Sequence, residues 1–84
     1  MQEYLRKGSS GLNKETGIIH AYDAFKGYGF IRREKGKDVF FFYDQLSNED
    51  YEPTMGDLVD FDVVTAPKGP KAINVQKIGH VELL

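Results

Sequence analysis

Aromatic side chains alternate along two short stretches of the sequence, and basic side chains stand beside them. The first stretch, KGYGFI, carries Tyr28 and Phe30 directly after Lys26. The second, DVFFFY, carries Phe40 and Phe42 in the same spacing. Aromatic rings stack on the bases of single-stranded nucleic acid while cations neutralise its phosphates, and each stacked base contributes roughly 1–3 kcal/mol. This spacing indicates a stacking surface, provided that the rings lie on an exposed face.

Strand alternation separates these rings from the expected core. Residues two apart in a strand share a face, so Ile31 lies opposite Tyr28 and Phe30. The expected core consists of Ile19, Ile31, Val39, Phe41, Val59, Phe61, Val63, Ile73 and Val75. Soluble monomers keep exposed apolar patches small. The rings of the opposite face therefore either bind a ligand or pack under loops or a partner chain, and periodicity leaves both interpretations open.

Catalytic and metal-binding chemistry is not expected. The sequence has no cysteine, and His20 and His80 have neither a paired nucleophile nor metal-ligand spacing. The glycines around Tyr28 do not indicate a phosphate loop, because no helix follows them. The sequence predicts a protein that is not an enzyme and that has no metal or cofactor.

Charge is distributed unevenly along the chain, although the formal net charge is only -2. A basic group falls within residues 26–37, and acidic residues concentrate within residues 49–62. The basic residues are Lys26, Arg32, Arg33, Lys35 and Lys37, and the acidic residues are Glu49, Asp50, Glu52, Asp57, Asp60 and Asp62. Nucleic-acid binding depends on the distribution of charge more than on its sum. The same pattern also fits an ordinary mixed surface.

The elements that must position these residues are short strands. Strand-prone runs span residues 17–23, 27–33, 38–43, 58–65 and 72–78, separated by turn signals and without a 3.6-residue apolar period. One helical turn is expected near residues 44–46, in the loop that holds Pro53 and Gly56. Five such strands predict a small all-β barrel or sandwich.

The length and the ends of the chain complete this picture. Eighty-four residues form at most one domain. Residues 1–15 are polar and contain GSSG, which is typical of a flexible tail, and residues 79–84 form a C-terminal extension. No apolar run approaches the roughly 20 residues that span a bilayer, and the N-terminus lacks the apolar stretch of a secretory signal. We expect a soluble cytoplasmic protein, either a monomer or a weak homodimer.

The two aromatic stretches resemble the ribonucleoprotein motifs of bacterial cold-shock proteins. KGYGFI is similar to the first motif and DVFFFY to the second, and the likeness covers residues 16–78, including the closing hairpin with its APKGPK turn. The resemblance implies a five-stranded antiparallel barrel of the OB type. It also implies binding of single-stranded DNA and RNA on strands one to three, with low sequence specificity. RNA chaperoning and regulation of transcription or translation are roles within that family.

The resemblance further implies a set of binding residues. The expected nucleic-acid-binding residues are Tyr22, Lys26, Tyr28, Phe30, Arg32, Phe40, Phe42, Tyr43, Tyr51 and Lys68.

The chain also departs from the family pattern. The family usually ends its first strand with lysine, tryptophan, phenylalanine and asparagine, where this sequence has His20, Ala21, Tyr22 and Asp23. Phe42 stands where the second motif usually has histidine. These changes predict weaker or redirected binding, with Arg32 as a compensating cation. The alternative is an OB-fold protein-interaction or oligomerisation module, to which the apolar residues Val81, Leu83 and Leu84 would contribute.

Overall fold

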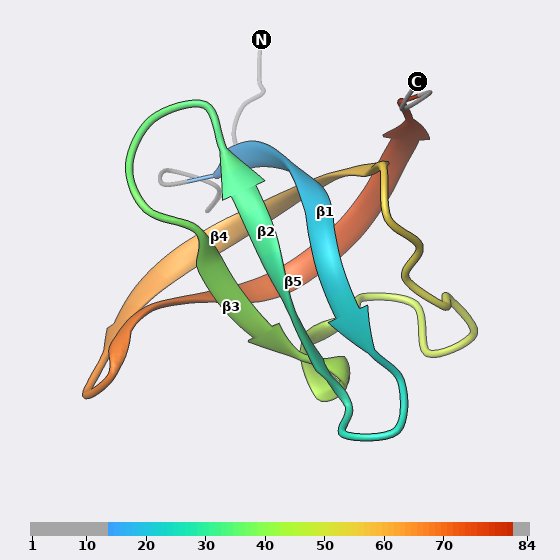
Figure 1. The fold of residues 1–84 in the computed structure, drawn as a ribbon, viewed down its shortest axis with the longest axis horizontal. Helices are drawn as coiled ribbons and strands as arrows, with labels where there is room; N and C mark the ends of the chain where they lie inside the picture. Colours follow the sequence, from blue (N-terminus) through green and yellow to red (C-terminus); the bar gives the residue numbers. More distant parts are fainter. Residues whose placement is uncertain (1–13, 82–84) are drawn as a thin grey trace, which may run out of the picture.

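The chain folds into a closed five-stranded barrel (Figure 1). The computed structural model describes residues 14–81. The strands are β1 (Glu15–Asp23), β2 (Tyr28–Arg33), β3 (Val39–Phe42), β4 (Asp57–Ala66) and β5 (Gly69–His80), and one turn of 3-10 helix, η1 (Tyr43–Gln45), follows β3. Around the barrel the order is β1-β2-β3-β5-β4, and β4 closes the barrel by pairing with β1. The predicted all-β barrel and the helical turn are thereby confirmed.

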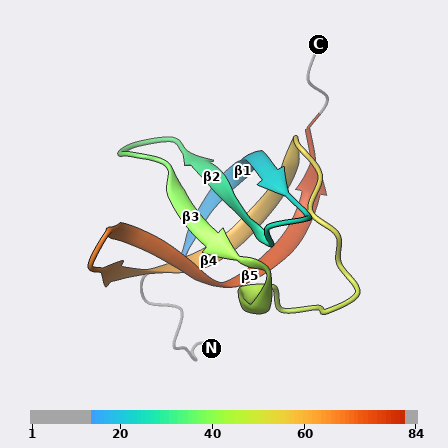
Figure 2. The same ribbon diagram turned by 60° about the horizontal axis from the view of Figure 1, so that its bottom comes forward.

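The barrel is mixed rather than purely antiparallel, so that detail of the predicted fold was wrong. β3 and β5 run parallel, with Phe40 paired to Lys71. The cause is the connection after β3, which passes through η1 and a long loop to the far side of the barrel before β4 begins (Figure 2). The β4–β5 hairpin then brings β5 back beside β3 in the same direction. The other four pairings are antiparallel.

A β-bulge in β1 reverses the faces of the strand's last residues. Ile19 pairs with Ile31, but Ala21 pairs with Phe30, so His20 has no partner of its own. One extra residue in a strand shifts the alternation of its side chains. As a result Ala21 joins the outer face, and the ring of Tyr22 turns inward.

A second bulge, in β5, changes which residues fill the core. Asp62 pairs with Ile73 and Asp60 with Gln76, and Asn74 has a positive φ of 53°. The shift places Ala72 inside, whereas Ile73 is only partly buried. The fully buried apolar residues are Ile19, Ile31, Val39, Phe41, Val59, Phe61, Ala72 and Val75. The predicted core was therefore wrong at Ile73. Val63, also predicted to be in the core, is only partly buried and packs against the core cluster.

The last strand is longer than the sequence predicts. β5 continues to His80, which pairs with Asp57, two residues beyond the expected end at Ile78. Residues 1–13 and 82–84 lie outside the described part of the chain, and with them most of the two predicted tails. Over residues 14–81, no helix has the length and apolarity that crossing a membrane requires.

Candidate nucleic-acid interface

Four aromatic rings form one continuous surface on the outer face of β2 and β3. Tyr28 pairs with Phe42 and Phe30 with Phe40, so the four side chains point to the same side of the hairpin. The ring centroids of Phe40 and Phe42 lie 4.8 Å apart, and Tyr28 lies 6.2 Å from Phe30 and 6.4 Å from both Phe40 and Phe42. Phe30 is 41% exposed and Phe42 38%. We call Tyr28, Phe30, Phe40 and Phe42 the aromatic platform.

Gly29 allows the platform strand to approach its neighbour closely. It points inward between the outward rings of Tyr28 and Phe30 and pairs with Tyr22 on β1. A Cβ at this position would overlap the backbone oxygen of Ala21 and would lie 3.0 Å from the ring of Phe41. No side chain fits there, which is the physical reason for a glycine in the middle of this strand.

Lys71 places a cation over one ring of the platform, and the sequence did not single it out. Its Nζ lies 5.4 Å from the centroid of the Phe42 ring, and its backbone pairs with Phe40. This position depends on the parallel pairing of β3 with β5, which no local sequence pattern predicts. The expected cation Lys68 lies three residues earlier, exposed in the turn between β4 and β5.

Arg32 shares the outer face with the platform and is held in place by two neighbours. Its Nε donates to Asp38 Oδ1 at 3.3 Å, and one terminal nitrogen lies 3.1 Å from His20 Nε2. Arg33, one residue on, points to the other face, where it donates to Glu15 and to the backbone oxygen of Lys37. Arg32 therefore remains a candidate phosphate contact.

The β1–β2 turn presents a ring that sequence reasoning missed. Phe25 is 98% exposed, the highest value among the large apolar side chains of the described residues. The turn around it is fixed, because Asp23 accepts hydrogen bonds from the backbone N–H groups of Lys26 and Gly27. The signal was available, since a phenylalanine between two predicted strands has no core position. The backbone of Lys26, an expected binding residue, is thus anchored beside this ring.

Three of the expected stacking tyrosines lie away from the platform. Tyr22, Tyr43 and Tyr51 line a cavity of about 610 Å³ between the end of β1, η1 and the loop before β4. The remaining lining residues are Asp44, Leu46, Glu49, Asp50, Glu52 and Pro53. The ring of Tyr22 stacks on the buried Phe41, with centroids 5.8 Å apart and planes 7° from parallel. We call this space the tyrosine cavity.

Carboxylates surround the tyrosine cavity. Burial raises the pKa of the Tyr22 hydroxyl, and the negative charges of Glu52 and Asp23 raise it further. Four of the nine lining residues are acidic, and none is lysine or arginine. The potential in the cavity is therefore negative, in contrast to that beside the platform.

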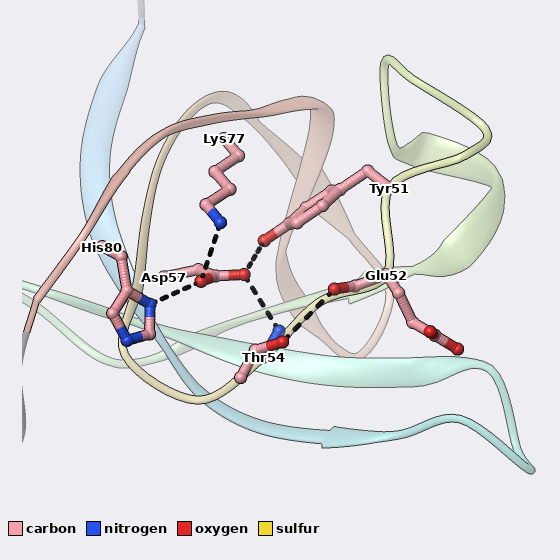
Figure 3. Close-up of polar contacts among 6 residues, drawn as sticks. All are labelled: Tyr51, Glu52, Thr54, Asp57, Lys77 and His80. Atoms are coloured by element: carbon pink, nitrogen blue, oxygen red, sulfur yellow. Dashed lines mark hydrogen bonds and ion pairs between the residues drawn. The ribbon is translucent and has the colours of Figure 1, made fainter.

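A buried carboxylate holds the hydroxyl group of Tyr51 (Figure 3). Asp57 is 1% exposed, and its Oδ2 accepts hydrogen bonds from Tyr51 Oη at 2.5 Å and from the Thr54 backbone N–H at 3.0 Å. Its Oδ1 lies 2.7 Å from His80 Nδ1 and 3.5 Å from Lys77 Nζ. We call this group of five residues the Asp57 clasp.

Opposing effects act on the ionisation of the Asp57 clasp. Burial by itself raises the pKa of the Asp57 carboxyl, but the hydrogen bonds from Tyr51, His80 and Thr54 and the charge of Lys77 outweigh it, and the net pKa is lowered. Burial and the bond to Asp57 raise the pKa of Tyr51. Among residues 14–81, no three histidine or acidic side chains gather as metal ligands would. We interpret the clasp as a structural anchor of the loop.

Comparison with known proteins assigns this architecture to a family. The family model described as 'Cold-shock' DNA-binding domain matches residues 15–78. A retron Se72 cold shock-like protein of Salmonella heidelberg is 47% identical over 66 residues, which cover 76% of this chain and 98% of that protein. The cold shock-like protein CspC of Bacillus cereus is 40% identical over 63 residues, which cover 74% and 97% of the two chains.

A solved structure agrees with the sequence relatives. The structure of drosophila Unr CSD456 superposes with a TM-score of 0.71 at 27% identity, over 82% of this chain and 28% of that one. The region that the family model matches contains β1 to β4, β5 as far as Ile78, and the whole aromatic platform. The chain therefore belongs to the cold-shock domain family, a family of nucleic-acid-binding proteins.

Proposed function

We propose that the chain binds single-stranded DNA and RNA by stacking bases on the aromatic platform. The observation that carries this proposal is the continuous, open group of four rings on β2 and β3, with Lys71 beside Phe42. A soluble protein gains little by leaving such rings in water. Bases stacked on them bury apolar surface, while Lys71 and Arg32 contact the phosphates. The nucleic-acid binding of the family supports the same function.

Low sequence specificity follows from this mode of binding. Every base presents a π-face, so stacking discriminates weakly between sequences. A protein that stabilises unpaired RNA in this way shifts weak hairpins toward their open form. RNA chaperoning, with regulation of transcription or translation in the cytoplasm, is the role that we propose.

The β1 edge of the platform weakens this binding. Ala21 pairs with Phe30 and Asp23 pairs with Tyr28, so a methyl group and a carboxylate flank the two rings of β2. The methyl group offers little stacking area, and the carboxylate repels a passing phosphate. We expect an affinity below that of relatives that carry a larger ring and a neutral amide at these positions.

Fluorescence titration with oligo-dT and with unstructured RNA at two salt concentrations tests the proposal. Phosphate neutralisation predicts a logarithmic salt slope of about -0.7 per phosphate contact. Phe30→Ala and Phe40→Ala should each lower the affinity by more than about tenfold, because each removes one stacking ring. Ile78→Ala is the matched control, since Ile78 is 48% exposed on β5 and lies outside the platform. Unchanged affinity in both phenylalanine variants would refute the platform.

The same rings could instead cover a protein surface, as in the interaction module that the sequence left open. The exposed Phe25 and Phe42 favour that interpretation if nucleic acid does not bind. Sedimentation at rising protein concentration distinguishes the two. Self-association that Phe42→Ala abolishes, together with an affinity for oligonucleotides that does not depend on salt, would support the interaction module instead.

A further inference from the structure

Tyr51 lines two cavities. It borders the tyrosine cavity, and it also borders a second cavity of about 500 Å³. The other residues around the second cavity are Ser47, Asn48, Val75, Gln76 and Lys77. Tyr51 is only partly buried, although its hydroxyl group is bound to the buried Asp57. The Asp57 clasp therefore holds one end of the side chain and leaves open space beside it.

The tyrosine cavity adjoins the aromatic platform. Tyr43 follows Phe42 directly in the chain, is 64% exposed, and lines the cavity together with Tyr51. A single strand that leaves the platform at Phe42 therefore meets Tyr43 and then Tyr51. Both tyrosines belong to the expected binding residues, and they offer the strand two further rings for stacking.

The charge beside Tyr51 differs between the two cavities. The carboxylates of the tyrosine cavity repel phosphates. Around the second cavity, the lining residues in the described part of the chain include Lys77 and no carboxylate. The Nζ atom of Lys77 lies 6.0 Å from the centroid of the Tyr51 ring. A phosphate near this ring is therefore favoured on the side of Lys77.

The loop that carries Tyr51 is joined to the barrel at its two ends. The backbone N–H of Ser47 donates to the Val75 carbonyl at 2.7 Å, and the backbone N–H of Gly56 donates to the Ile19 carbonyl at 3.0 Å. Between these two points, the hydroxyl group of Tyr51 joins the loop to the barrel through the clasp. The orientation of the ring therefore depends on how firmly Asp57 itself is held.

The end of β5 completes the clasp. His80 Nδ1 lies 2.7 Å from Asp57 Oδ1, and it donates because an ionised carboxylate only accepts. Figure 3 shows His80 and Tyr51 reaching Asp57 from opposite sides. One residue further, the backbone N–H of Val81 donates to the Gly56 carbonyl at 2.8 Å. His80 lies two residues beyond the end of the match to the family model, so that match does not account for its role.

We propose that His80 is a positioning residue for nucleic-acid binding, which holds Asp57 and through it fixes the ring of Tyr51 for stacking. This inference rests on the proposed function and adds the end of β5 to the binding site. A side chain that is already held in its bound orientation loses less conformational freedom when the ligand arrives, which favours binding. The effect of His80 should therefore appear only when a base reaches Tyr51.

Titration with fluorescently labelled oligo-dT of about 4 and about 12 nucleotides tests the inference, since OB folds occupy sites in this range. The shorter strand is held by the platform, and the longer one extends to Tyr51. Tyr51→Phe keeps the ring but removes the hydroxyl group, and it should lower the affinity for the longer strand by about threefold to tenfold. His80→Ala should have an effect of the same size. Neither variant should change the affinity for the shorter strand by more than about twofold.

A double-mutant cycle shows whether His80 acts through Tyr51. In the Tyr51→Ala background, the further change His80→Ala should alter the affinity for the longer strand by less than about twofold. His80→Asn, whose amide can still donate to Asp57, should keep most of the parent's affinity. Ile78→Ala is the matched control, because Ile78 is 48% exposed on the same strand. It should bind both oligonucleotides as the parent does.

Two results would overturn the inference. The first is a Tyr51→Phe variant that binds the longer strand as tightly as the parent. The second is a loss from His80→Ala that is equal for both lengths, or equal with and without the Tyr51 ring. If His80→Ala does not fold, Tyr51→Phe and the comparison of lengths decide the question.

Failure of the proposed function would look different. The parent would then bind neither oligonucleotide, or its binding would be insensitive to Phe30→Ala and Phe40→Ala. These results concern the aromatic platform, whereas those above concern only the longer strand and the clasp. The two failures are therefore distinguishable.

Discussion

At the scale of single residues, the platform differs from its surroundings in how each side chain is held. Phe30 and Phe42 meet the neighbouring rings edge-on or tilted, and both remain partly exposed. Arg32 is fixed by Asp38 and His20, and Lys71 lies against Phe42. In the binding mode that we propose, the rings supply the stacking area and these two cations set the dependence of the affinity on salt.

Lys71→Gln tests the cation that the sequence did not single out. Removing its charge should lower the affinity for oligo-dT by about threefold to tenfold and reduce the magnitude of the salt slope by about 0.7, one phosphate contact. Salt-dependent titration measures both quantities. Lys35→Gln, in the exposed β2–β3 loop, is the matched control. If the two variants behave alike, Lys71 acts only through net charge.

Ala21→Trp tests the weak edge of the platform. Ala21 pairs with Phe30 and lies on the outer face because of the bulge at His20. A tryptophan there should add one stacking ring and tighten binding by about tenfold, given roughly 1–3 kcal/mol per stacked base. Quenching of its fluorescence by oligo-dT would report the contact. An affinity equal to that of the parent would mean that β1 does not face the ligand.

At the scale of elements, the bulges in β1 and β5 explain why the sequence predicted some positions and not others. β2 and β3 pair without a register shift, so period-two alternation placed the platform and Phe41 correctly. β1 contains one extra residue relative to β2, and β5 contains two relative to β4; each insertion changes the face of the side chains on one side of it relative to those on the other. Tyr22 follows the insertion in β1 and Ile73 directly precedes one in β5, so the placement of both depends on pairing rather than on local pattern.

Gly29→Ala probes how tightly β1 and β2 approach. The added Cβ would meet the backbone oxygen of Ala21, which cannot rotate aside. We therefore expect the free energy of unfolding to fall by about 1–3 kcal/mol. Urea unfolding measures this loss. Gly79→Ala serves as the control, because its Cβ would lie 3.6 Å from a Leu58 side-chain carbon, an ordinary contact. Equal stability of the two variants would show that the strands separate at little cost.

At the scale of the whole molecule, the Asp57 clasp joins parts of the chain that the sequence keeps apart. Tyr51 belongs to the long loop, and Lys77 and His80 belong to β5. In the sequence, Asp57 is only one of several acidic residues in its region. Its burial arises from the closure of β4 against both β1 and β5, which is a property of the assembled barrel.

The clasp predicts a dependence of stability on pH. Folding lowers the pKa of Asp57, whereas an unfolded aspartate titrates near about 3.9. The unfolded state then binds more protons in acid, so the contribution is complete at neutral pH and is lost as the pH falls through the folded pKa. Asp57→Asn should lower the free energy of unfolding by about 1–3 kcal/mol at neutral pH and reduce its fall in acid.

Urea unfolding of the parent chain and Asp57→Asn at neutral pH and near about pH 3 provides the measurement. Asp44→Asn is the control, because Asp44 is exposed on η1 and belongs to no buried network. If the free energy of unfolding falls by the same amount in the parent and in Asp57→Asn between these two pH values, protonation of the clasp does not affect stability.

The parallel pairing of β3 with β5 also has a consequence for synthesis on the ribosome. The β2–β3 hairpin with its four rings is translated before β4 and β5, and the strand that covers the second edge of β3 is the last of the five. A nascent chain that ends before Gly69 therefore presents an open strand edge beside an apolar face, the combination that promotes misassociation. Nucleic acid or a chaperone that covers the rings at this stage would protect the growing chain until β5 closes the barrel.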